Sequence, residues 1–126
     1  MTVVHITTLR NTLAEAVRTA IAAGAGNSSL VLRDGATTAV TFDIGGTPFG
    51  AASSGIITLG GVPIDAVASA SVTELDNFQL KDGDGTTQIT GSITAVGMGG
   101  DIEVTNVNVA SGQDCTLESM AYEAPA

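Results

Sequence analysis

A chain of 126 residues, 44% of them hydrophobic, is long enough to form one domain with a core that needs no disulfide. The net charge of −9 is uneven, because three arginines and one glutamate precede position 34, whereas one lysine and twelve carboxylates lie from Asp34 onward. This acidity argues against a nucleic-acid partner, which would require Lys and Arg side chains to neutralise phosphates. The segment MTVVHITTLR lacks the basic start and long apolar run of a signal peptide, and no apolar run approaches 18 residues, so we expect no membrane segment and folding in a cytoplasm.

The first predicted element is an amphipathic helix over residues 8–23, preceded by an N-terminal arm of residues 1–7. Thr7 or Thr8 is the expected N-cap, and Gly24 is the expected C-terminal stop. Apolar residues at spacings of three and four form the predicted packing face: Leu9, Leu13, Ala16, Val17, Ala20 and Ile21. Polar residues form the opposite face, which we expect to lie in solvent: Arg10, Asn11, Glu15 and Arg18.

From residue 30 onward the apolar residues alternate with a period of two, which predicts strands. Seven or eight short apolar segments are separated by Gly- or Asp-containing turns, including a strand over 67–72 and a hairpin over 76–93. The pattern predicts a mainly β fold, an antiparallel β-sandwich or jelly roll with one N-terminal amphipathic helix, in which residues 8–126 form a single domain. Seven side chains should be buried between two sheets: Phe42, Phe78, Leu80, Ile89, Ile102, Val104 and Leu117.

The inventory of chemically reactive side chains is small. His5 is the sole histidine and Cys115 the sole cysteine, which excludes the standard zinc sites and makes Cys115 an expected buried hydrophobe. We therefore expect no enzyme, no metal and no cofactor. The turn KDGDG carries Asp82 and Asp84, with Asp76 as a third candidate oxygen ligand, and matches only a fragment of a calcium-binding loop. We interpret it as a hairpin turn, with calcium binding as the alternative.

Three segments after position 48 contain short strand and turn motifs whose order and spacing carry a resemblance to a known family. They are FGAASSGIITLGGVPI (49–64), FQLKDGDGTTQITGSI (78–93) and DIEVTNVNVASGQDCTLESMAYEAP (101–125). In this order, after an amphipathic helix, the chain resembles a family of small structural proteins of tailed bacteriophages. The resemblance implies a capsid decoration, or cement, protein on the outer head surface of the virion, with the major capsid protein and neighbouring copies of itself as partners. A tail or neck component, including one that contacts a receptor, is the alternative.

The N-terminal region supplies the candidate partner-binding residues. Val3, Val4 and Ile6 are apolar side chains on a segment too short to fold alone. Arg10 and Arg18 follow on the helix, where they would form a positive patch on an otherwise acidic molecule and steer docking onto an acidic partner. The alternative for Val3 to Ile6 is an edge strand in the protein's own sandwich.

Overall fold

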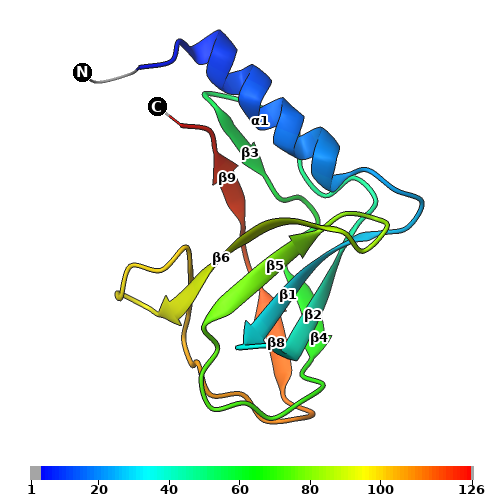
Figure 1. The fold of residues 1–126 in the computed structure, drawn as a ribbon, viewed down its shortest axis with the longest axis vertical. Helices are drawn as coiled ribbons and strands as arrows, with labels where there is room; N and C mark the ends of the chain where they lie inside the picture. Colours follow the sequence, from blue (N-terminus) through cyan, green and yellow to red (C-terminus); the bar gives the residue numbers. More distant parts are fainter. Residues whose placement is uncertain (1–3, 126) are drawn as a thin grey trace.

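The protein is mainly β with one helix near its N-terminus, as predicted, in a computed structural model that describes residues 4–125 (Figure 1). Helix α1 spans Thr7–Ile21. The strands that follow it are β1 (Ser28–Asp34), β2 (Thr37–Gly45), β3 (Ile56–Thr58), β4 (Ile64–Val67), β5 (Asn77–Lys81), β6 (Thr87–Ala95), β7 (Ile102–Val104), β8 (Asp114–Leu117) and β9 (Ala121–Glu123).

The strands form one curled sheet and two ribbons. The sheet has the order β2-β1-β5-β6-β7, and its neighbours are antiparallel except for the parallel pair β6–β7. The antiparallel ribbons are β3–β9 and β4–β8. The predicted hairpin over 76–93 is confirmed as β5 and β6. The predicted strand over 67–72 is wrong: β4 ends at Val67, and Val72 makes only an isolated bridge to Val109.

The ends of α1 differ from the prediction. Ile6, not Thr7 or Thr8, is the N-cap residue, and its side chain makes no capping hydrogen bond. The helix ends two residues before the predicted boundary at 23, and Gly24 follows with φ of +97°. At this end the buried Ser28 hydroxyl donates a 2.5 Å hydrogen bond to the Ile21 carbonyl, one of the last carbonyls of α1, which have no partner within the helix.

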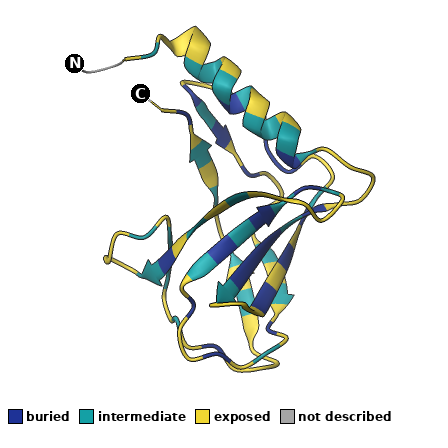
Figure 2. Ribbon diagram, in the orientation of Figure 1, coloured by how far each residue is buried: buried dark blue, intermediate teal, exposed yellow. Residues whose placement is uncertain are grey.

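The core lies against one face of the five-stranded sheet (Figure 2). The strand register sets Leu30 of β1 between Phe42 of β2 and Leu80 of β5, and two residues along it sets Leu32 between Val40 and Phe78. These six side chains are buried, because residues two apart on neighbouring strands share a face.

Four of the predicted core residues are only half-buried. Phe42, Phe78 and Leu80 are buried as expected. The prediction was wrong for the others, which pack against the edge of the core: Ile89, Ile102, Val104 and Leu117. The physical reason is incomplete filling between the sheet and the segment 100–123, where two cavities of about 640 and 450 Å³ lie. Each of the four residues lines at least one of these cavities.

Candidate partner-binding surface

Two apolar residues of the arm, Val4 and Ile6, are exposed, and the described residues 4–6 add no strand to the protein's own sheet. Val4 and Ile6 are 76% and 72% exposed, and the backbone at Ile6 is extended. Val3 lies outside the described residues. For the described residues 4–6, the alternative of an edge strand in the protein's own sandwich is therefore wrong, and two large apolar side chains are left in solvent.

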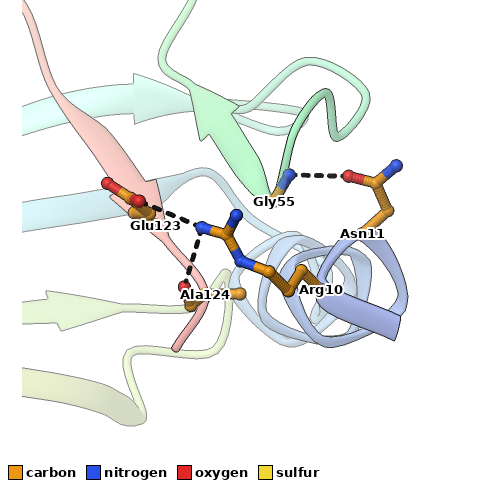
Figure 3. Close-up of polar contacts among 5 residues, drawn as sticks. All are labelled: Arg10, Asn11, Gly55, Glu123 and Ala124. Carbon is orange, nitrogen blue, oxygen red and sulfur yellow. Dashed lines mark hydrogen bonds and ion pairs between the residues drawn. The ribbon is translucent and has the colours of Figure 1, made fainter. Parts of the chain in front are cut away.

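Arg10 is part of the fold rather than of an open positive patch. Its Nη2 atom donates to Glu123 Oε1 at 3.0 Å and to the Ala124 carbonyl at 3.3 Å, so α1 is fixed to the end of β9 (Figure 3). The next residue, Asn11, accepts a 2.7 Å hydrogen bond from the Gly55 amide through its Oδ1 atom. Both side chains thus join the helix to the β3–β9 ribbon.

Arg18 and Glu15 fix the second half of α1 in the same way. Arg18 donates through Nε to the Phe49 carbonyl at 3.0 Å and through Nη1 to Glu15 Oε2 at 2.9 Å. Glu15 Oε1 accepts from the Ala52 amide at 2.6 Å. The Ala52 amide, followed by Arg18, lowers the pKa of the Glu15 carboxyl, because both contacts favour the charged form.

The expected solvent face of α1 is therefore wrong. The four polar residues assigned to it contact the body of the protein: Arg10, Asn11, Glu15 and Arg18. Ala14, fully buried, lies at the centre of this packed face. The face is rotated from the predicted apolar one by roughly the 100° that separates neighbouring helix residues. Because each arginine is paired with a carboxylate, the two do not form the strong positive patch that we expected.

The rotation leaves a row of apolar side chains partly in solvent. Leu9 is 42% exposed, Ala16 is exposed, and Leu13 and Val17 are half-buried. These four residues, which we call the helix stripe, lie on successive turns of α1. The polar contacts on the other side hold the helix rigidly, so the helix stripe is presented in a fixed orientation.

The KDGDG turn fastens the end of α1 to the sheet. The Gly83 amide donates to the Ala23 carbonyl at 2.7 Å, and the Gly26 amide donates back to the Gly83 carbonyl at 3.1 Å. Asp84 Oδ1 accepts from the Ala25 amide at 3.3 Å. These three hydrogen bonds connect residues 23–26 to the β5–β6 turn, which supports the interpretation of this sequence as a structural turn.

The carboxylate of Asp82 is buried, 6% exposed, inside the same turn. Its Oδ1 atom accepts from the amides of Asp84 and Thr86, and its Oδ2 atom accepts from Gln88 Nε2 at 2.9 Å. Asp76 lies beyond the opposite end of β5 and binds the Gly35 amide, so it does not join Asp82 and Asp84 as a third ligand. Within residues 4–125, no group of three or more His, Cys, Asp or Glu side chains is arranged to hold a metal ion.

These hydrogen bonds predict acid sensitivity. The Gln88 side chain, followed by the Thr86 and Asp84 amides, lowers the pKa of Asp82, and Asn77 followed by Gly35 lowers that of Asp76. A carboxyl whose pKa is lower in the folded than in the unfolded chain stabilises the fold at pH values above its pKa in the unfolded chain. This stabilisation is lost as pH falls through that value, 3.8 for aspartate, towards the folded pKa.

We therefore expect the melting temperature to be flat from neutral pH to about pH 5 and to fall below pH 4. Thermal melts followed by circular dichroism at a series of pH values measure this. An Asp82→Asn variant should be less stable at neutral pH and should lose less stability on acidification than the unmodified protein. Equal acid slopes for the two proteins would contradict the assignment to Asp82.

A second exposed apolar feature was not predicted from the sequence. In the loop between β6 and β7, Val96 and Met98 are 65% and 73% exposed. The loop is ordered by the Gly99 amide, which donates to Glu103, and by the Gly100 amide, which donates to Thr94. The sequence VGMGG is typical of a turn, and the signal in the sequence was the presence of two large apolar residues beside its glycines.

The single cysteine lies on β8. Cys115 is half-buried against the core, close to its expected place as a small hydrophobe. Burial, followed by the neighbouring Asp114 charge, raises the pKa of its thiol. The thiolate is the reactive form, so Cys115 is a poor nucleophile near neutral pH.

Comparison of the chain with protein-family models, with curated proteins and with solved structures finds no match in any of the three. The described part of the chain has no helix of the length and hydrophobicity required to span a bilayer.

Proposed function

We propose that this protein is a bacteriophage capsid decoration protein, which binds the major capsid protein on the outer surface of the head and reinforces the shell without catalysis. The order of the turn and strand motifs, which resembles that of small phage structural proteins, supports the class. The observation that carries the proposal is the helix stripe, an apolar row on a helix that polar contacts fix to the body.

Such a surface suits attachment to a repeated lattice. Burying one Leu or Val side chain contributes roughly 1.5–3 kcal/mol, so a few of them give a weak single contact. A shell presents many identical sites. Copies that also contact one another on the shell bind with a high effective concentration, which raises the overall avidity above that of each weak contact. The apolar side chains of the helix stripe are thus suited to binding, but they are too few to hold a single isolated copy tightly.

The acidic body fits an outward-facing position. The chain from Asp34 onward carries twelve of the carboxylates, which would repel packaged DNA on the inner side of a shell. The first carboxylate of the chain is Glu15, so the arm and the first turns of α1 carry none. This part approaches an acidic capsid surface with little electrostatic cost.

Substitution on the helix stripe tests the proposal. Leu9→Glu places a charge at an exposed position and should leave folding intact, but it should reduce binding to purified undecorated heads at least tenfold, about 1.4 kcal/mol or more. Thr19→Glu, an exposed position on another side of the same helix, is the matched control and should bind normally. Co-sedimentation with particles, with melting temperatures of the free variants, measures both effects.

The location on the virion separates the decoration function from the tail or neck alternative. Electron microscopy with a labelled copy should place the protein over the faces of the head. Label restricted to the neck or tail would contradict decoration and support the alternative. Normal binding of the Leu9→Glu variant to heads would instead show that the helix stripe is not the contact.

A further inference from the structure

We propose that a gap between β7 and β8 binds an extended, basic segment of a different protein as an added β-strand. The strands curl around one core in the order β7-β6-β5-β1-β2. β4 continues the curl, because Ser69, just after it, donates to the Ala39 carbonyl of β2 at 2.8 Å (Figure 1). β8 follows as the partner of β4. Within residues 4–125, β7 and β8 are not paired with one another, so the curl is open between them.

The gap leads into the cavity of about 450 Å³, which is within the roughly 300–1,000 Å³ of typical ligand pockets. Its floor consists of buried side chains of the sheet, among them Leu32, Val40 and Phe42. Its two sides are residues 102–106, which include β7, and residues 113–119, which include β8. The cavity thus reaches the core between two strand edges, and an apolar side chain that enters it is removed from water.

The main chain of β7 presents polar groups to the gap. The Val96 amide donates to the Val104 carbonyl at 3.1 Å, so the main-chain groups of Val104 point towards β6. Successive residues of a strand direct these groups to opposite sides. The N–H and C=O groups of Glu103, the preceding residue, therefore point away from β6 and towards the gap.

The main chain of β8 presents polar groups from the opposite side. The Ala68 amide donates to the Gln113 carbonyl at 2.9 Å, and the two residues form a hydrogen-bonded pair in register with the β4–β8 ladder. Such pairs recur at every second residue of an antiparallel ladder, here at Cys115 and Leu117. Thr116 lies between them, so its N–H and C=O groups point away from β4 and towards the gap.

An extended segment between these two edges would close the curl. Strand addition is a general mode of peptide recognition, in which main-chain hydrogen bonds provide affinity and alternate side chains provide specificity. The apolar residues that flank the gap are only half-buried: Ile102, Val104, Cys115 and Leu117. Because every second side chain of an added strand would lie against them, the occupant is apolar at alternate positions.

Carboxylates around the cavity determine the charge of the occupant. Glu103, Asp114 and Glu118 line it, and its described lining contains no Lys, Arg or His. Neither of the two ion pairs found within residues 4–125 involves these carboxylates, so no arginine or lysine of the chain neutralises them. A segment with Lys or Arg between its apolar residues is attracted to this rim, whereas an acidic segment is repelled.

The same criterion excludes a second copy of this chain as the occupant. The chain has four Lys and Arg residues. Arg10 and Arg18 lie on α1, and Arg33 and Lys81 lie on β1 and β5, which already have a strand on each side. None of the four thus lies on an extended segment that could enter a neighbour's gap. The occupant is therefore a different protein, and this inference depends neither on the helix stripe nor on capsid decoration.

Synthetic peptides test the proposal. The probe is KVTVKVTVK with blocked ends, in which valine occupies every second position. It should bind at least roughly tenfold more tightly than KVVTKTVVK, which has the same composition without the alternation, and than EVTVEVTVE, which reverses the charge. Fluorescence anisotropy of labelled peptides measures the three affinities. Absence of binding, or equal affinity for KVTVKVTVK and either control peptide, would overturn the proposal.

Substitutions at Thr116 locate the binding. Thr116→Pro removes the N–H that points into the gap and should weaken binding of KVTVKVTVK at least roughly tenfold. Thr116→Val also lacks the hydroxyl but keeps the N–H, so it should bind the peptide like the unmodified protein. Melting temperatures show whether both variants are folded. Normal binding by a folded Thr116→Pro variant would contradict strand addition at β8.

Charge reversal gives a test that requires no change in the ladder. Glu118→Lys, at an exposed position on the rim, should weaken binding at least roughly threefold. Asp43→Lys is the matched control with the same charge change, because Asp43 is exposed on β2 next to Phe42, whose side chain faces the cavity. Equal affinities of the two variants would overturn the role of the rim. Self-association of the unmodified protein that the peptide reverses would overturn the assignment to a different protein.

Discussion

Phe78→Ala is expected to destabilise the protein by about 3–5 kcal/mol, the usual cost of truncating a buried Phe. Phe78 is 7% exposed and lies beside Leu32 in the strand register. Its ring packs directly over Gly91 on β6, where an added Cβ would lie only 2.5 Å from the ring atom Cε1. Removing the ring would therefore expose the backbone of β6 and enlarge the neighbouring cavity, since the cavity already touches Phe78.

Urea unfolding of Phe78→Ala and of Phe78→Leu measures this cost. Phe78→Leu keeps most of the apolar volume and should lose much less, about 1 kcal/mol. Lys81→Ala, on the same strand but half-buried on the other face, is a control that should change stability by less than about 0.5 kcal/mol. A loss below about 1 kcal/mol for Phe78→Ala would show that the strand phase assigned to β5 is incorrect.

The strand pattern could be predicted because it depends on local alternation. Phe78 and Leu80 alternate with Gln79 and Lys81, and the structure buries the first pair and leaves the second only half-buried. The Asp-Gly turn then reverses the chain into β6 as expected. The alternation determines which side chains share a face of the sheet. That face is buried wherever a second layer of the protein covers it.

The orientation of α1 could not be predicted in the same way. Periodicity places Leu9 on the face expected to pack, but the structure packs the face centred on Ala14. The preference arises from tertiary partners: the amides of Ala52 and Gly55 and the carbonyl of Phe49 bind polar side chains of the helix. Ala14 is small, so the helix can approach these loops closely enough for the contacts to form. The helix sequence itself does not specify where the loop amides and carbonyl lie.

The role of the acidic residues is also visible only in three dimensions. The sequence analysis treated their number as a property of the whole surface. Among the described residues 4–125, however, eight of the 13 carboxylates accept a hydrogen bond from a backbone amide. They are Glu15, Asp34, Asp43, Asp76, Asp82, Asp84, Asp101 and Glu103. Turns and strand ends leave amides without ladder partners, and nearby carboxylates satisfy them.

The cavities explain why the predicted core was larger than the observed one. Ile102 and Leu117 alternate with polar neighbours as core residues do, but they face space that the single chain leaves unfilled. Sequence periodicity reports that a side chain is to be buried and does not report whether its own chain or a partner buries it.

Gly24→Ala is expected to destabilise the protein by about 2–4 kcal/mol through two separate effects. Gly24 has φ of +97°, a backbone conformation that residues with a Cβ rarely adopt. A Cβ at this position would also lie 2.6 Å from the Asp84 amide nitrogen and 2.7 Å from the Gly83 carbonyl carbon. These are backbone atoms of the KDGDG turn, so they cannot move aside without breaking the contacts that fasten the end of α1 to the sheet.

Gly85→Ala separates the two effects, because Gly85 lies in the same turn with φ of +82° and no atom within 4 Å of its ideal Cβ position. This control should lose only the conformational part, about 1 kcal/mol. Chemical unfolding of both variants gives the difference, and amide hydrogen exchange at residues 23–26 should accelerate in Gly24→Ala alone. Equal losses in the two variants would mean that the helix end and the turn are not held in contact, because the close approach at Gly24 is the one feature that distinguishes the two sites.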